Sequence, residues 1–161
     1  FMFQISNLLG LQILDLHDNQ LETLPDSISA LTRLTKLNLS HNRLASLPPG
    51  IDNQSETSIA SNQPITGIYK RSGLKIFLRV IALLYEINAS NNKIPAIPDF
   101  IGLGSLLQFL DFSTNRLSSL PANLGDLKHL REVILSMNRF SASPESLYSC
   151  SKLETILIRD N

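Results

Sequence analysis

The stretch from Leu107 to Asn138 repeats one pattern of apolar and polar positions around two asparagines that lie 23 residues apart. In the first copy, Leu110 and Phe112 alternate with polar residues just before Asn115. Such alternation predicts a short strand with one buried face. A Leu-x-x-Leu-Pro run follows the asparagine, and its proline predicts that the strand does not continue. Each copy therefore predicts one strand, one sharp turn and one return segment.

The same frame fits most of the chain. Units begin at Leu11, Leu34, Leu84, Leu107 and Leu130, and a sixth strand begins at Leu153. An asparagine follows each strand, at Asn19, Asn42, Asn92, Asn115, Asn138 and Asn161. Because an asparagine amide carries both donors and an acceptor, we expect these side chains to bind backbone groups at the strand ends. One unit cannot bury its own apolar side, so we expect the units to stack on one another.

The frame fails once, in the polar and irregular residues 52–73. We expect N-terminal repeats at 1–51, then an insertion, splice join or gene-model error at 52–73, then C-terminal repeats at 74–161, all in one solenoid. The nearly continuous apolar run Leu74–Tyr85 predicts a helix of about three turns. Its lack of a polar face favours packing on the core over the alternative, an exposed docking helix.

These residues follow the pattern LxxLxLxxNxLxxLPxxLxxLxx, which resembles the leucine-rich repeat family in its short intracellular form. The resemblance implies an α/β fold: a leucine-rich repeat solenoid with a concave parallel β-sheet and convex loops or short helices. It also implies an intracellular binding or scaffold protein. Neither end of the sequence resembles a polar capping repeat, so we expect a fragment of a longer array or a product with missing segments.

Composition narrows the class of partner. The 161 residues include 14 basic and 14 acidic side chains, and this balance disfavours nucleic acid and anionic membranes. No apolar run approaches the about 20 residues that span a bilayer, so we expect no membrane insertion. The one cysteine, Cys150, occupies a leucine position, and we expect a small core residue rather than a reactive thiol. The absence of paired cysteines and of a signal peptide predicts an intracellular, cytoplasmic location.

No catalytic, metal-binding or cofactor-binding arrangement is evident in the sequence. The histidines His17, His41 and His129 fall at different positions of different repeats. Asp15 lies near His17 on the expected concave face, but no cysteine or second histidine completes a set of metal ligands. The serines of that face lack a partnered base, and no phosphate-binding loop occurs. We therefore expect no enzyme activity, no metal and no cofactor.

The candidate binding residues flank the core positions of each strand, because they point to the concave face and are not needed for the core. Phe109, Ile134 and Leu157 form an apolar cluster toward the C-terminal end, and such clusters with a polar rim often mark interaction sites. The alternative is that Ile134 and Leu157 are covered by residues missing from this chain. The predicted partner-binding residues are Phe109, Asp111, Glu132, Ile134, Ser136, Leu157 and Arg159.

The sequence thus predicts a non-catalytic protein–protein interaction module or intracellular scaffold that binds a protein partner through its concave face. Two alternatives stay open. One is the targeting part of a ligase or phosphatase whose catalytic domain lies outside this chain, and the other is a fragment of a receptor ectodomain. The fold does not identify the partner, and the pattern does not give the oligomeric state.

Overall fold

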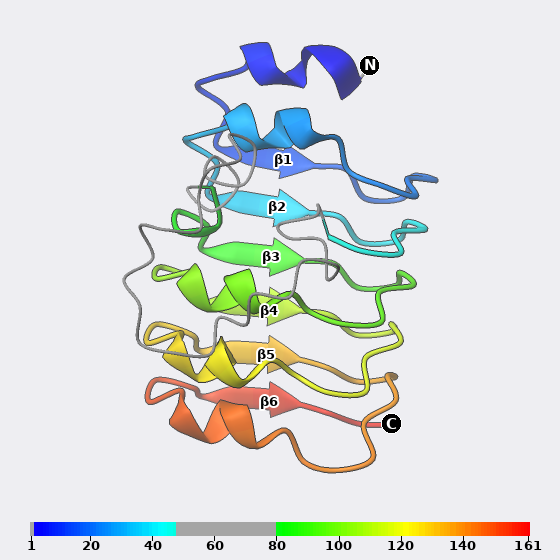
Figure 1. The fold of residues 1–161 in the computed structure, drawn as a ribbon, viewed down its shortest axis with the longest axis vertical. Coiled ribbons are helices and arrows are strands. Elements are labelled where there is room, and N and C mark those ends of the chain that lie inside the picture. The colour runs from blue at the N-terminus through cyan, green and yellow to red at the C-terminus, as the bar shows by residue number, and fades with distance from the viewer. Residues whose placement is uncertain (1, 48–79) are drawn as a thin grey trace, which may run out of the picture.

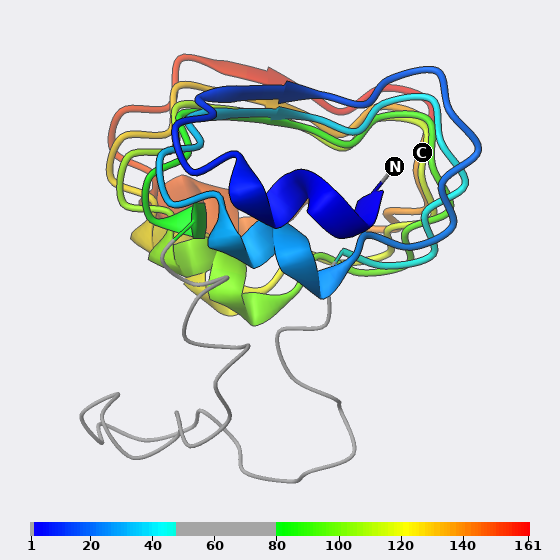
Figure 2. The same cartoon turned by 90° about the horizontal axis from the view of Figure 1, so that it is seen from above.

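The computed structural model describes residues 2–47 and 80–161, which form one parallel sheet with short helices opposite it (Figure 1). The six strands follow chain order across the sheet: β1 (Ile13–Asp15), β2 (Lys36–Asn38), β3 (Glu86–Asn88), β4 (Phe109–Asp111), β5 (Glu132–Ile134) and β6 (Thr155–Leu157). The return segments form 3-10 helices: η1 (Met2–Asn7), η2 (Asp26–Ala30), η4 (Asp99–Leu103), η5 (Ala122–Asp126) and η6 (Glu145–Ser149). Seen from above, the strands line one side of the solenoid and the helices line the other (Figure 2).

Each strand pairs in parallel with the next, and equivalent residues of successive repeats are paired. This register holds even between β2 and β3, where Lys36 pairs with Glu86, 50 positions further along the chain. The long connection therefore leaves the strand order intact. Most of that connection lies outside the described residues, so the expected insertion or join at 52–73 stays a prediction.

One apolar core fills the space between the sheet and the helices. The middle residue of each inner strand is buried, as at Leu110 and Val133, which have no exposed surface. At the ends of the stack, where one neighbour is lacking, the same position is less covered, and Ile156 of β6 is 43% exposed. Burial of the core therefore depends on contact between neighbouring repeats.

Prolines precede four of the short helices. Pro25, Pro98, Pro121 and Pro144 each have extended backbone and stand immediately before a five-residue 3-10 helix. The fixed φ and missing N–H group of proline suit this position, because the chain must stop pairing as a strand there. These segments confirm the expected convex loops or short helices.

The predicted helix over Leu74–Tyr85 lies mostly outside the described residues, and its expected end is wrong. Val80 and Ile81 are helical, a turn follows, and Glu86 begins β3. The helix cannot reach Tyr85 because the N–H groups of Tyr85 and Glu86 donate to the Thr35 carbonyl at 2.8 and 3.3 Å. Pairing with the neighbouring repeat therefore overrides the local apolar pattern.

The prediction that Cys150 is a core residue is confirmed. Its side chain is 5% exposed, and its Sγ lies 3.4 Å from the Leu124 carbonyl oxygen, to which it donates. Burial raises the pKa of the Cys150 thiol above its usual value. A thiol in this state is a poor nucleophile, because the thiolate is the reactive form.

Candidate functional site

The asparagines that follow the strands join consecutive repeats. The Nδ2 of Asn115 donates to the carbonyls of Ala89, Phe112 and Ser113 at 2.9, 3.1 and 3.1 Å. Its Oδ1 accepts from the Ile94 N–H at 3.0 Å. Two of these four bonds reach the preceding repeat and pair backbone groups that the three-residue strands leave unpaired. Equivalent bonds to the preceding repeat are made by Asn42, Asn92 and Asn138.

The two terminal asparagines make weaker connections. Asn19 donates to the carbonyls of Leu16 and His17 within its own turn. Asn161 Oδ1 accepts from the Asn138 N–H group at 3.1 Å, but the bonds equivalent to those of Asn115, to the Leu135 carbonyl and from the Phe140 N–H group, are both longer at 3.4 Å. The asparagine ladder is therefore strongest in the middle of the stack.

The residue before each ladder asparagine has a left-handed backbone. The φ angles are between 53° and 59° at Asp18, His41, Asn91, Thr114, Met137 and Asp160. Asp, Asn and His adopt this conformation more readily than other residues with a side chain. Thr114 is β-branched, so its φ of 53° stores backbone strain that the surrounding bonds must hold.

The concave face carries the first and third residues of each strand, because the middle residue of each inner strand is buried. Phe109 lies in register beside Glu132, and Asp111 lies beside Ile134, which lies beside Leu157. All five are half-buried. The structure thus brings five of the seven predicted binding residues together on β4, β5 and β6. We call these five the mixed patch.

The other two predicted binding residues, Ser136 and Arg159, lie just beyond the strands. The Ser136 Oγ accepts from the Arg159 N–H at 3.1 Å, so this hydroxyl joins two neighbouring turns. The Arg159 side chain is exposed at the rim of the mixed patch. Ser136 therefore has a structural role in addition to any binding role.

At the same strand positions, β1 to β3 carry polar side chains apart from Ile13, which is 60% exposed at the first position of β1. We call the five polar residues the polar patch, defined as Asp15, Lys36, Asn38, Glu86 and Asn88. The Asn38 Oδ1 accepts from the N–H and the hydroxyl of Ser40 at 3.1 and 2.8 Å. The same bond to the N–H group two residues later occurs at Asp15, Asn88 and Asp111.

These Asx turns correct the expectation that third-position side chains are free for binding, because one oxygen of each holds the backbone. The sequence feature that could have predicted these turns is an Asp or Asn two residues before a Ser or His. Ser40, which lies two residues after Asn38, is only 6% exposed, so its hydroxyl serves this turn. Ile134 and Leu157 occupy the same strand position but have no acceptor, so their side chains take no part in such a bond.

The two patches also differ in whether their carboxylates are paired with a cation. Lys36 Nζ lies 2.8 Å from Glu86 Oε2, so the polar patch neutralises this carboxylate internally. Among the described residues, neither Asp111 nor Glu132 lies in an ion pair. The mixed patch therefore presents two carboxylates without a cation.

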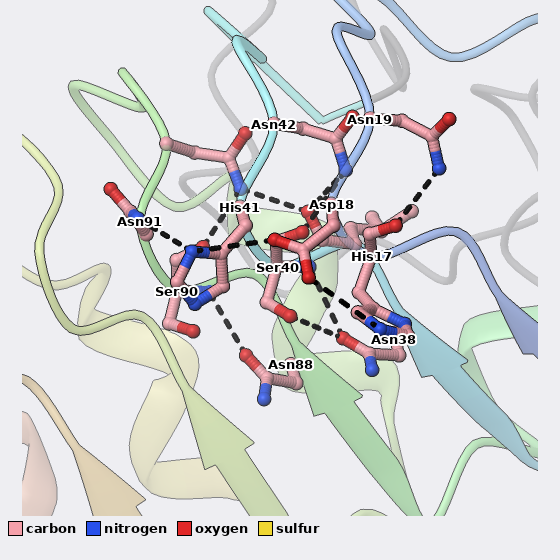
Figure 3. Close-up of polar contacts among 12 residues, drawn as sticks. His17, Asp18, Asn19, Asn38, Ser40, His41, Asn42, Asn88, Ser90 and Asn91 are labelled. Carbon is pink, nitrogen blue, oxygen red and sulfur yellow. Dashed lines mark hydrogen bonds and ion pairs between the residues drawn. The ribbon is translucent and has the colours of Figure 1, made fainter.

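A group of polar side chains lines the turns after β1, β2 and β3 (Figure 3). His17 Nδ1 lies 2.6 Å from Asp15 Oδ1, and this bond raises the pKa of His17. The His17 N–H group and ring lower the pKa of Asp15. Asn91 Nδ2 donates to His41 Nδ1 at 2.8 Å. Across residues 2–47 and 80–161, no three His, Cys, Asp or Glu side chains are placed to hold a metal ion.

Stacked single-strand repeats in constant register, an asparagine ladder and convex 3-10 helices together define an α/β leucine-rich repeat solenoid. Two family models, both described as leucine rich repeat, match residues 3–44 and 106–127. These matches and the similar structures below support membership of the leucine-rich repeat family. No curated protein sequence matches the chain significantly.

Several solved structures share the fold. A leucine-rich repeat protein of Leptospira interrogans superposes with a TM-score of 0.64 at 26% identity, over 99% of this chain and 40% of that one. The plant peptide hormone receptor RGFR1, in complex with RGF2, superposes with a TM-score of 0.70 at 27% identity, over 98% of this chain and 22% of that one. The ectodomain of the receptor kinase SOBIR1 of Arabidopsis thaliana superposes with a TM-score of 0.64 at 24% identity, over 92% of this chain and 69% of that one. The chain thus spans less than half the length of the first two.

Leucine-rich repeat proteins generally mediate protein–protein interaction, and the fold is typically a non-catalytic binding module. In the part of the chain that the structure describes, no helix has the length and apolar character needed to cross a membrane.

Proposed function

We propose that this chain is a non-catalytic protein–protein interaction module or scaffold that binds a protein partner through its concave face. The observation that carries the proposal is the mixed patch. Its Ile134 and Leu157 side chains are half-buried on an open sheet face and replace the residues that hold the backbone elsewhere. An apolar centre with a polar rim is the usual composition of an interaction site.

A polypeptide is the partner class that the comparisons support best. The similar receptor RGFR1 is described as a peptide hormone receptor and was solved in complex with RGF2. The zero net charge of this chain gives no electrostatic reason for a nucleic acid partner. The concave face then serves as a docking surface for another protein.

We further propose an intracellular, cytoplasmic location. The support is the resemblance to short intracellular repeats and, within it, to leucine-rich repeat-containing protein 40 with internal repeats missing. That finer resemblance rests on residues 11–48, 86–98 and 130–161. Cell fractionation of the tagged protein tests the location, and recovery from the culture medium would contradict it.

The test of the binding function is affinity capture with the wild-type chain and with the double variant Ile134→Asp and Leu157→Asp. We expect the variant to lose the partner and keep its melting temperature within about 5 °C, because both side chains lie on the open face. A control variant, Leu103→Asp with Tyr148→Asp, places the same charges on exposed apolar residues of η4 and η6. Partner loss in the control but not in the concave variant would refute the proposal.

A further inference from the structure

We propose that the mixed patch recognises a polypeptide segment in which a lysine or arginine stands next to an apolar residue. This inference rests on the proposed function, because it names the chemistry of the partner at the same site. Three features carry it: the alternation of residue types in the patch, the unpaired carboxylates and the cost of burying them.

Apolar and acidic side chains alternate in both directions across β4 and β5. Phe109 stands beside Glu132 in register, and Asp111 stands beside Ile134. Along each strand the order is reversed, so Phe109 and Ile134 lie on one diagonal and the two carboxylates on the other. Neighbouring strands are about 5 Å apart, and alternate residues along a strand are about 7 Å apart. One cationic group can therefore approach both carboxylates.

The carboxylates of Asp111 and Glu132 differ from the other acidic groups on this face. Glu86 is paired with Lys36 at 2.8 Å, and Asp15 is bonded to the His17 ring at 2.6 Å. Asp111 uses only its Oδ1, which accepts from the N–H and the hydroxyl of Ser113 at 2.8 and 2.7 Å. Its second oxygen and the Glu132 carboxylate have no cationic partner in the described residues.

The free-energy cost of removing water from Asp111 and Glu132 determines which kind of partner can bind. Because the residue types alternate, a surface that covers Ile134 also removes water from Asp111 and Glu132. A purely apolar surface would leave both charges desolvated and unpaired, which disfavours binding. An acidic surface would add repulsion to that cost. A cation replaces the lost water with charge-assisted hydrogen bonds, and its neighbouring apolar residue can contact Ile134 and Leu157.

Phe109 adds a second reason for a cation. Its half-buried ring stands beside Glu132 at the edge of the patch. A guanidinium or ammonium group that reaches Glu132 therefore passes close to an aromatic ring, and such contacts are attractive. Arg159, the exposed cation at the rim, follows Leu157 by two residues and forms no ion pair with either carboxylate.

The experiment is a selection from a random linear peptide library displayed on phage, with the wild-type chain as bait. We expect the recovered sequences to be enriched in Lys or Arg adjacent to an aliphatic or aromatic residue. The recovered peptides are then synthesised with a fluorescent label, and their Kd is measured against four proteins. These are the wild type, Asp111→Asn with Glu132→Gln, Ile134→Asp with Leu157→Asp, and the control Asp99→Asn with Glu145→Gln.

The variant Asp111→Asn with Glu132→Gln, called the carboxylate variant, should weaken binding about tenfold and abolish most of its dependence on salt, because two partly exposed ion pairs with the peptide are lost. Asn at position 111 can keep the bond to Ser113, as Asn38 and Asn88 do at their own positions. The control makes the same change in charge on η4 and η6 and should bind as the wild type does.

Peptides without a basic residue, a failed selection or an unchanged Kd in the carboxylate variant would each overturn the inferred partner chemistry. In the case of an unchanged Kd, loss of binding in the Ile134→Asp and Leu157→Asp variant would still support the concave site. Full binding by that variant would overturn the proposed site as well, so the two failures are distinguishable.

Discussion

The polar patch on β1 to β3 and the mixed patch on β4 to β6 occupy equivalent positions of the same sheet, yet they use their side chains differently. In the polar patch, Asn38 and Asn88 each hold a backbone N–H group, and Lys36 neutralises Glu86. In the mixed patch, Ile134 cannot accept such a bond, and Glu132 has no cation beside it in the described residues. The first patch satisfies its own polar groups, whereas the second leaves apolar and charged groups available.

Exposure alone therefore does not identify a binding residue in a repeat protein. A displayed side chain that caps the backbone is part of the scaffold, and its replacement has a cost in stability. A displayed side chain with no such bond is free to specify a partner. The hydrogen bonds of each repeat therefore distinguish side chains that hold the backbone from side chains that are available to a partner. The position of a residue within the repeat does not make this distinction.

Replacing a ladder asparagine beside each patch tests whether the two patches rest on the same scaffold, and these variants should lose the most stability. Asn42→Ala, at the turn after the polar patch, and Asn115→Ala, at the turn after the mixed patch, should each cost about 1–3 kcal/mol, because both leave buried backbone groups unpaired. Asn19→Ala should cost only a few tenths, because Asn19 bonds within its own exposed turn. Urea denaturation measures all three. Unequal losses at Asn42 and Asn115 would indicate two different scaffolds.

A reciprocal exchange tests the difference between the patches directly. Asn88→Ile should cost about 1 kcal/mol, because the Ser90 N–H group loses its acceptor. Ile134→Asn should change stability by less than about 0.5 kcal/mol, as is usual for surface positions, but should abolish peptide binding. Urea denaturation and fluorescence anisotropy provide the two readouts. Equal stability losses in the two variants would mean that Ile134 is a core residue.

A smaller effect concerns the turns that follow the patches. Asn91 and Thr114 both have a φ of 53°, in the turns after β3 and β4. Asn tolerates this conformation, whereas a β-branched residue is strained, so Thr114→Asn should stabilise the protein by about 0.5–1 kcal/mol. Asn91→Thr is the reverse change and should destabilise by at least as much, because it also removes the bond from Asn91 Nδ2 to His41 Nδ1. Thermal melts of both variants check the pair, and a shift of the same sign in both would contradict the explanation.

Much of the scaffold could be predicted because its core residues and turn asparagines recur at a fixed period in the sequence. Leu110 and Val133 lie one period apart and point into the same core, and Asn115 and Asn138 recur because each turn presents the same unpaired backbone groups. The direct pairing of Lys36 with Glu86 could not be predicted, because spacing alone does not reveal which strands are neighbours across a break in the period. The end of the predicted helix was also wrong, since the decisive bonds to a carbonyl group come from another repeat.

The candidate site could be predicted only in outline. Alternation about the core positions placed Phe109, Ile134 and Leu157 on one face, which the register of the sheet explains. Which displayed residues are free depends on bonds to the backbone, and these follow a short-range rule that the repeat pattern does not contain. Asp111 both holds the backbone and remains available for binding, because its Oδ1 accepts from the Ser113 N–H group and its second oxygen makes no such bond.

A slight dependence of stability on pH should come from the polar patch, through the bond between Asp15 and His17. The bond to Asp15 raises the pKa of His17 above 6.5, so its contribution to stability is full below 6.5 and is lost as pH rises through the raised pKa. The pKa of Asp15 is lowered below 3.8, so its contribution is full above 3.8 and is lost as pH falls through the lowered pKa. Both side chains are exposed, so the change in stability should be slight.

The clearer readout of this bond is a nuclear magnetic resonance titration of the His17 ring. Asp15→Asn should lower the pKa of His17 toward 6.5, because a neutral amide no longer favours the protonated ring. Peptide binding to the mixed patch should stay constant over the same titration, because none of its five residues is a histidine. An affinity that follows the His17 titration would mean that the partner also contacts the polar patch, and the two regions would then form one binding surface.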